Sequence, residues 1–346
     1  MTAPATSNEE RATRRIASLD AFRGFTVASM LLVNNPGTWS AIYWPLAHAE
    51  WHGWTPTDLI FPFFLFIVGI TTELSRKEPL GIFRRGLIII ACGLALHLFP
   101  YFRFETLRYI GVLQRIGIVY IIAALIAWRC SRRTIAIIVL AILLGYWAVL
   151  TRGPLEPPNA TIAAQVDRAL IPLPHLWKQA KTWDPEGPLS TIPAVATALL
   201  GVLAAGAVKE KNIKWLAIAG AIGIAVGLAW GLVFPINKAL WTSSYVVLTA
   251  GFACVILAIW IRWLPAKPFD VFGINPLIAF VGSGAMARIL GIIKIDGVSL
   301  QALIYRTVYK PYFEPHFASL LYALTFVLVW YAILWVLKRR GIVLKV

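Results

Sequence analysis

Charged side chains are scarce in this 346-residue chain, at 14% of all residues, and acidic ones are the scarcest, with 16 Asp and Glu against 32 Lys and Arg. Hydrophobic residues make up 59%, above the roughly 45–50% of ordinary soluble domains. Such a composition excludes a soluble globular enzyme. The net charge of +16 would suggest nucleic-acid binding if the charges formed one face. They lie in short clusters between apolar runs, so we expect no nucleic-acid partner.

Cysteine is also rare. Cys92, Cys130 and Cys254 lie in or beside apolar runs, with no CxxC spacing and no Cys/His grouping. The sequence therefore predicts small buried hydrophobes here, and neither a disulfide framework nor a metal site. The polar start of the chain leads into an apolar run without a small-residue cleavage site, so we expect a retained membrane anchor and no removable signal peptide.

Ten apolar runs are long enough to be spanning helices, each of which needs about 20 mostly apolar residues. They cover residues 20–36, 55–74, 83–99, 109–128, 133–151, 188–208, 213–234, 241–262, 271–292 and 316–337. The predicted fold is an all-α, polytopic integral membrane protein. We expect a segment at 1–19, a single transmembrane domain at 20–337 and a tail at 338–346.

The distribution of Lys and Arg predicts the orientation of these spans. Nineteen of the 32 fall on one side, ten on the other, and three lie within spans. Because cytoplasmic loops are enriched in Lys and Arg, we expect both termini in the cytoplasm, in a bacterial-type inner membrane. All five histidines then fall on or near the periplasmic side, as does the longest connection, at 152–187, in which 159–171 resembles a short interfacial helix.

The first periplasmic loop is a candidate site for proton chemistry. It carries His48 and His52 together with Glu50 and Asp58, among four tryptophans. A neutral imidazole beside a carboxylate can take a proton from an amine or hydroxyl. The alternative is an interfacial aromatic belt, with Asp58 as the cap of the next helix. Asn34, at the end of the first span, could bind a carbonyl oxygen or simply terminate its helix.

Arginines within spans are the second group of candidates, since a charge in hydrocarbon is costly and is retained for a reason. Arg23 lies one turn from Asp20, which favours a local ion pair or snorkelling of its side chain. A cavity lined by Arg115 and Arg288 would attract an anionic ligand, although structural bonds between helices are an equal alternative. The candidate cofactor-binding residues are Arg23, Gln114, Arg115, Asn275 and Arg288.

A third group lies at the outer ends of the sixth and eighth predicted spans. Asp184 and Glu186 could hold a cationic amino sugar or cap a helix, and Trp241, near Lys238, could stack on a sugar ring. For Trp241, an interfacial tryptophan is the alternative. These four residues are the candidate substrate-binding residues.

Several of these segments together resemble one family, the transmembrane acyltransferases typified by heparan-alpha-glucosaminide N-acetyltransferase, with the closest likeness to its compact bacterial members. The segments are Asp20 to Gly24, Asn34, His48 to Asp58 followed by Phe61-Pro62, Gly111 to Arg115, Asp184 to Thr191, and Asn237 to Ser244. They occur in order along nearly the whole chain. The combination is far more specific than any single motif.

This resemblance implies an enzyme that takes acetyl-CoA from the cytoplasm and delivers its acetyl group to an amine or hydroxyl of a sugar on the other side. His48 occupies the position of the family's active histidine, and Asn34 that of a nearby polar residue implicated in catalysis. The resemblance leaves open whether His48 is a general base or is itself acetylated. With Asp58 these two form the candidate catalytic set, and Glu50 and His52 suggest an acceptor other than heparan glucosamine.

The expected partners are acetyl-CoA, an amino-sugar or glycan acceptor and membrane lipid. A homodimer is compatible with this interpretation, although the sequence does not determine the oligomeric state. The main rival hypothesis is a transporter of sugars or sugar fragments, in which the buried arginines and outer tryptophans form a permeation site. A non-catalytic scaffold is the third. The absence of a detectable repeat and the position of His48 outside the mid-membrane region weigh against transport.

Overall fold

The computed structural model describes residues 5–210 and 212–344, with side chains from residue 17 onward. The Cα atoms cluster into two compact units. One holds the described residues up to Ala47 and from Ile256 onward, and the other runs from His48 to Val255. We call them the terminal unit and the central unit. The organisation as a single transmembrane domain stays a prediction.

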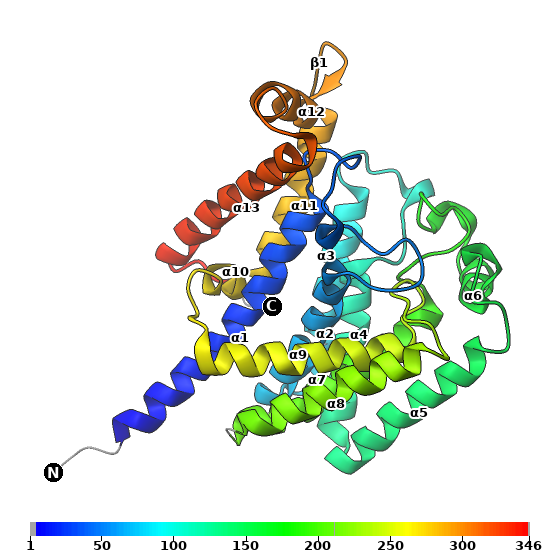
Figure 1. The fold of residues 1–346 in the computed structure, drawn as a ribbon, viewed down its shortest axis with the longest axis vertical. Helices are drawn as coiled ribbons and strands as arrows, with labels where there is room; N and C mark the ends of the chain where they lie inside the picture. Colours follow the sequence, from blue (N-terminus) through cyan, green and yellow to red (C-terminus); the bar gives the residue numbers. More distant parts are fainter. Residues whose placement is uncertain (1–4, 211, 345–346) are drawn as a thin grey trace. The chain divides into compact units, whose positions relative to one another are not determined.

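Among the described residues of the central unit, the regular secondary structure is all helical (Figure 1). Its longer helices are α2 (Ile60–Leu74), α3 (Pro79–Leu98), α4 (Val112–Arg129), α5 (Arg132–Leu150), α6 (Ile162–Leu170), α7 (Pro188–Lys209), α8 (Ile213–Gly231) and the first part of α9 (Ser243–Trp263). Short 3₁₀ turns are η1 (Trp44–Leu46, in the terminal unit), η2 (Pro56–Leu59), η3 (Phe104–Thr106), η4 (Pro158–Ala160) and η5 (Leu173–His175). The helix predicted within 159–171 corresponds to α6.

The terminal unit combines the two ends of the chain. Its elements are α1 (Ala5–Asn34), the end of α9, α10 (Asp270–Ile274), α11 (Pro276–Ile292), α12 (Leu300–Ile304), the single π-helical turn η6 (Tyr305–Tyr309) and α13 (Pro315–Arg339). A two-residue antiparallel hairpin, β1 (Lys294–Ile295) with β2 (Val298–Ser299), is the one sheet of the described chain. α1 packs on α10, α11 and α13.

The expected all-α membrane fold is confirmed. Eight described helices are long and apolar enough to cross a membrane, and they correspond to eight of the ten predicted spans. The first predicted span lies within α1, whose helix begins well before residue 20. The ninth is divided between α10 and the 17-residue α11. The break falls at Asn275, because a residue followed by proline is disfavoured in the helical conformation.

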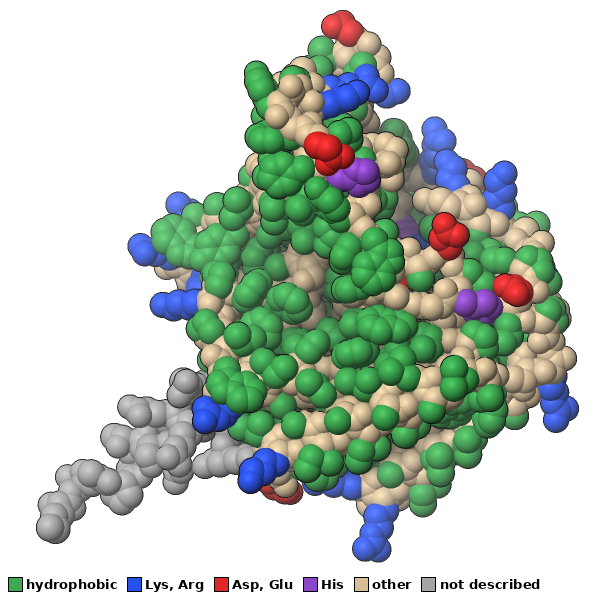
Figure 2. Space-filling model, viewed as in Figure 1, with side chains coloured by type: hydrophobic (Ala, Val, Ile, Leu, Met, Phe, Trp, Pro, Cys, Tyr) green, Lys and Arg blue, Asp and Glu red, His purple; other side chains and the backbone are tan. Residues whose placement is uncertain are grey.

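α2 and α7 form the buried centre of the central unit, whereas most apolar side chains of α3, α5 and α8 are at least partly exposed. Figure 2 shows hydrophobic side chains over much of the face in view. Exposed apolar area on this scale suits contact with lipid.

Two glycines allow α2 and α7 to pack closely. A Cβ atom on Gly69 would lie 1.8 Å from the backbone oxygen of Ala198, and one on Gly201 would lie 2.0 Å from that of Phe66. Small residues at helix contacts let backbones approach in this way. The α2–α7 contact therefore requires glycine at both positions.

We predict that Gly201→Ala destabilises the protein by about 1–3 kcal/mol, the usual cost of overpacking a close contact. The matched control is Gly145→Ala in α5, where an added Cβ would meet nothing within 4 Å and where alanine stabilises a helix by about 1 kcal/mol. Thermal unfolding in detergent measures both. Equal melting temperatures for the two variants would contradict this account of the contact.

Candidate active site

The centre of the candidate site is a histidine–carboxylate pair in the central unit. His48 Nδ1 lies 2.7 Å from Asp58 Oδ1. Asp58 is almost completely buried, whereas the side chain of His48 is 48% exposed. A carboxylate at Nδ1 favours the tautomer with its proton there, which leaves Nε2 as the acceptor. The sequence-based pairing of His48 with Asp58 matches this geometry.

Asp58 holds the histidine loop against the start of α2. Its Oδ2 accepts hydrogen bonds from the backbone nitrogens of Ala49 and Thr55, each at 3.0 Å, and from the hydroxyl of Thr55 at 3.2 Å. Thr55 and Asp58 form a capping box at the turn that opens into α2. The two predicted roles of Asp58, helix cap and partner of His48, therefore occur in one carboxylate.

Lys238 contacts the same pair from above the imidazole ring. Its Nζ lies 3.0 Å from Nδ1 and 3.3 Å from Nε2 of His48, and 3.4 Å from Asp58 Oδ1. A point nearly equidistant from both ring nitrogens lies over the ring face, because in the ring plane it would collide with the carbon between them. The ammonium therefore lies against the face of the ring, within hydrogen-bonding distance of both nitrogens.

The loop before α9 delivers Lys238 to this position. The amide of Asn237 donates to the backbone oxygen of Trp51 at 2.9 Å, and Gly53 donates its backbone N–H to the backbone oxygen of Ile236 at 2.8 Å. Burial lowers the pKa of Lys238, and the negative charges of Asp58 and Glu186 oppose that shift. Lys238, predicted as a substrate-binding residue, is thus a neighbour of His48.

Asp184 and Glu186, predicted to bind an amino sugar, are both bonded to Arg108. The Arg108 guanidinium donates to Asp184, with Nε 2.7 Å from Oδ2, and to Glu186 Oε2 at 2.5 Å. Burial raises the pKa of Asp184, while the positive charges of Arg108 and Arg115 lower that of Glu186 against its own burial. The same two carboxylates raise the pKa of Arg108 despite burial.

Arg115 and its neighbour Gln114 are buried inside the central unit. One Arg115 nitrogen donates to the backbone oxygens of Pro185 and Gly187 and to the hydroxyl of Ser190. The other two guanidinium nitrogens have no hydrogen-bond partner among the described residues, and neither does either amide atom of Gln114. Buried polar atoms without partners are rare and call for an explanation.

Trp241 is fully buried, so it is not available at the surface to stack on a sugar in this structure. Its indole N–H donates to the hydroxyl of Thr197 at 3.0 Å, and the Arg115 guanidinium lies 5.1 Å from its ring centroid. Trp241 therefore helps to support Arg115. Its role in substrate binding stays a prediction.

The other predicted site residues lie in the terminal unit. Asn34 is exposed at the end of α1. The Arg23 guanidinium binds Asp20 and the backbone oxygen of Gly273, and that of Arg288 binds the backbone oxygen of Gly284, four residues earlier. These residues and Arg115 belong to different units, so the shared anionic cavity stays a prediction.

Asn275, also in the terminal unit, has both amide atoms occupied by the C-terminal tail. It donates to the backbone oxygen of Ile342 at 3.0 Å and accepts from the backbone N–H of Leu344 at 2.9 Å. These bonds attach the end of the chain to the α10–α11 break. Cofactor binding by Asn275 stays a prediction.

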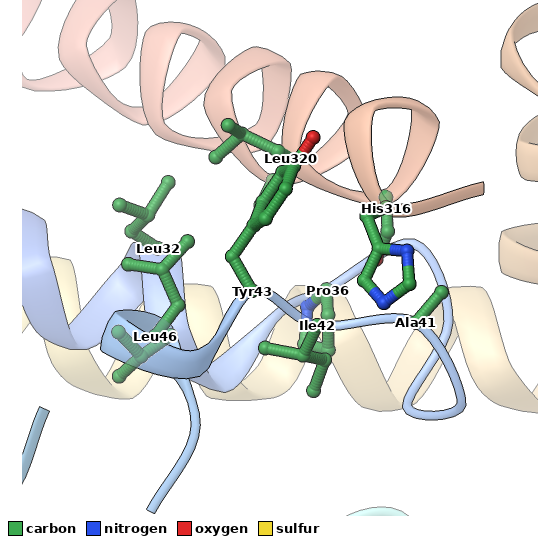
Figure 3. Close-up of a pocket in the computed structure, with 11 residues that line it drawn as sticks. Leu32, Pro36, Ala41, Ile42, Tyr43, Leu46, His316 and Leu320 are labelled. Atoms are coloured by element: carbon green, nitrogen blue, oxygen red, sulfur yellow. The ribbon is translucent and has the colours of Figure 1, made fainter. Parts of the chain in front are cut away.

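A second histidine–carboxylate pair lies in the terminal unit, where His316 Nδ1 is 2.8 Å from Glu314 Oε1. Both side chains are well exposed. His316 lines a small, mostly apolar pocket, at the opposite end from Leu32 and Leu46 (Figure 3). Because Glu314 is exposed, this pair lacks the buried carboxylate that distinguishes the His48 site.

Sequence reasoning missed Arg108, Asp167 and Tyr245. Arg108 is the cation of the Asp184–Glu186 cluster, and Tyr245 donates its hydroxyl to the backbone oxygen of Asp58 at 2.5 Å. Asp167 accepts the backbone N–H of Asp184 at 2.9 Å. Residues 184–186 include two acidic side chains and no basic one, and this indicated that a cation from elsewhere in the chain binds them. Nothing local in the sequence indicated that Asp167 is buried.

Comparison with known proteins identifies the family. The family described as "Heparan-alpha-glucosaminide N-acetyltransferase, catalytic" matches residues 15–220, well over half of the chain. The chain belongs to this family. The matched region includes His48, Asp58, Arg115 and Glu186, whereas Lys238 lies beyond it.

Two curated relatives have the same description. Heparan-alpha-glucosaminide N-acetyltransferase of Homo sapiens is 28% identical over 362 residues, covering 81% of this chain and 54% of the relative. The Mus musculus protein is 28% identical over 351 residues, covering 78% and 53%. The chain thus spans about half the length of the curated relatives it matches.

Asp167 makes the stability of the central unit dependent on pH. Burial, with a smaller effect from the Asp184 carboxylate, raises its pKa from 3.8 to about 7. The unfolded chain releases this proton near pH 4, whereas the folded chain keeps it until about pH 7. Between these values the folded state binds more protons, so stability falls as the pH rises.

We predict that Asp167→Asn removes this part of the pH dependence, on the order of 4 kcal/mol between pH 4 and pH 8. The asparagine oxygen still accepts from the backbone of Asp184. Chemical unfolding in detergent across this pH range measures the slope, with Glu105→Gln at an exposed site as the control. A slope in Asp167→Asn equal to that of the wild type would refute this assignment.

Proposed function

We propose that this protein is a membrane acetyltransferase that moves an acetyl group from acetyl-CoA to an amine or hydroxyl of an amino sugar or glycan. The observation that carries the proposal is His48, which is held at Nδ1 by a buried carboxylate while about half of its side chain stays exposed. Membership of the N-acetyltransferase family supports the reaction type.

The chemistry requires one base. Nε2 of His48 would take the proton of the attacking amine as its nitrogen forms a bond to the acetyl carbonyl carbon. The carbon–sulfur bond then breaks, the coenzyme leaves as a thiolate, and the proton on His48 returns to that sulfur. The products are an acetamide and a free thiol. Asp58 stabilises the imidazolium that forms between these steps.

An acetylated His48 is the alternative course of the same reaction. Nε2 would attack the thioester carbon and displace the coenzyme as a thiolate. The acceptor amine would then attack the acetylimidazole, the bond from carbon to Nε2 would break, and the proton lost by the amine would protonate the thiolate. Both courses use Nε2 of His48. In the first course, the positive charge of Lys238 destabilises the imidazolium form of His48. The imidazolium is therefore short-lived.

The buried, unpartnered atoms of Gln114 and Arg115 support contacts with polar groups of acetyl-CoA. In the terminal unit, Asn34 is proposed as a catalytic residue, and Arg23, Asn275 and Arg288 as cofactor-binding residues. For the acceptor, we propose Asp184, Glu186, Lys238 and Trp241. Arg108 already binds Asp184 and Glu186. The acceptor can therefore bind these carboxylates only if it displaces Arg108.

The proposed orientation follows from the distribution of Lys and Arg. The acetyl donor would be used from the cytoplasm, where both termini lie, and the His48 site would face the periplasm of a bacterial-type inner membrane. The acetyl group alone then needs to cross.

The test is acetyl transfer by the purified protein in detergent, with radiolabelled acetyl-CoA and glucosamine as acceptor. We expect His48→Ala to lose label transfer by roughly 10²–10⁴-fold, the usual contribution of a general base. The matched control is His316→Ala, which removes the histidine of the exposed His316–Glu314 pair and should keep wild-type activity. Melting temperatures show that both variants are folded.

Three outcomes would contradict the proposal. One is equal activity in the wild type and His48→Ala. Another is failure to consume acetyl-CoA with a panel of amino-sugar and hydroxyl acceptors. The third is sugar movement across vesicles without any acetylation, which would favour the transporter.

Asp58→Asn tests the role of the carboxylate. The amide has the same shape but no charge, so it neither stabilises the imidazolium nor favours the Nδ1 proton. We expect kcat to fall roughly 10²–10⁴-fold with a small change in KM. Glu314→Gln, the equivalent change in the other pair, should leave kcat unchanged. A fall in kcat no larger than that in Glu314→Gln would rule out this role.

A further inference from the structure

A second polar site lies in the central unit, at the opposite end of α2 from Asp58. There the end of α2, the start of α3 and the end of α4 line a small hollow that opens to the surface. Arg76 and Lys77 line one side, and Tyr120 and Trp128 line the other. By the Lys and Arg distribution this end faces the cytoplasm.

Positive charge at this site exceeds the available negative charge. Glu73, which is nearly buried, lies 3.0 Å from Arg76 and 3.5 Å from Lys209 and so serves two cations. Lys77, Arg84 and Arg85 add further positive charge. Burial lowers the pKa of Lys77, and the charges of Arg85 and Arg84 lower it further. Cations grouped in this way attract an anion.

Arg85 has the geometry of an anion-binding side chain. Its guanidinium lies over the Tyr120 ring, 5.0 Å from the centroid. Its buried Nε has no hydrogen-bond partner, and Arg85 makes no ion pair with a described carboxylate. An arginine held on an aromatic face presents a fixed fork of N–H donors, and that fork matches the oxygens of phosphate.

We propose that the basic cluster beside this hollow is a phosphate-binding site, in which Arg85, stacked on the lining residue Tyr120, binds a phosphate ester together with Lys77 and Arg76. Two sources have this chemistry. One is the headgroup of an anionic phospholipid, since basic pockets between helices at a cytoplasmic surface bind such headgroups. The other is the phosphates of coenzyme A, which would rest on the proposed function. The aromatic and apolar wall at Tyr120 and Trp128 suits an attached acyl chain or an organic group.

The test measures binding by delipidated protein in detergent, with two probes titrated separately. These are dioctanoyl phosphatidylglycerol and coenzyme A, and the readout is the shift in melting temperature. Arg85→Gln should weaken binding of at least one probe roughly tenfold, the equivalent of about 1.4 kcal/mol and less than a charge-assisted hydrogen bond at its strongest. Arg85→Lys, which keeps the charge, should recover part of this loss.

Arg133→Gln is the matched control, because it removes one exposed arginine near the same end of α4 that, unlike Arg85, does not stack on a described residue of the hollow. Its affinities should equal those of the wild type. Melting temperatures without probe show whether each variant is folded, and if Arg85→Gln is not, the comparison of Arg85→Lys with Arg133→Gln decides.

The outcomes separate the two sources. Weaker phosphatidylglycerol binding with unchanged coenzyme A binding identifies the lipid headgroup, and the reverse identifies the coenzyme. If the wild type binds neither probe, or if Arg85→Gln and Arg85→Lys bind both as tightly as Arg133→Gln does, the proposal is wrong. His48→Ala should bind both probes normally, so a failure of acetyl transfer and a failure of phosphate binding are distinguishable.

Discussion

The burial of the Asp58 carboxylate is the interaction on which the candidate site depends. A charge this deeply buried is tolerated only when its oxygens are fully hydrogen-bonded. Here the donors come from the His48 ring, from the backbone of the loop and from Thr55. Each donor is also a positional constraint, so satisfying the charge fixes the loop, the start of α2 and the tautomer of His48 together.

Other charged side chains in the central unit also need partners that offset the cost of burying their charge. Lys238 faces Asp58 and Glu186, Arg108 binds Glu186 and Asp184, and the backbone of Asp184 binds Asp167. From Asp58 to Asp184 the charges alternate in sign, and that lowers the cost of burying them in an apolar protein. Asp167 forms no ion pair with a described cation, and burial raises its pKa to about 7.

The sequence predicted much of the fold because hydropathy and length determine which segments can cross a membrane. Eight predicted spans correspond to long apolar helices, and the deviation at Asn275 follows from a local proline effect. Within the site, the pairing of His48 with Asp58 was predictable, since both lie in one short loop. The contact of Lys238 with His48 was not, because it depends on hydrogen bonds between segments about 185 residues apart. Nor could periodicity show that Trp241 is buried beneath Arg115.

The helix α2 carries polar chemistry at both of its ends and none along most of its length. Its 15 residues rise roughly 22 Å, from the Asp58 turn to the hollow beside Arg76. Glycine contacts hold its middle directly against the α7 backbone, so α2 cannot shift without disrupting that packing. A group bound at the basic end would therefore act on a rigid helix. Any influence on His48 would come from the position of α2 as a whole, because no polar side chain in its apolar middle links the two ends.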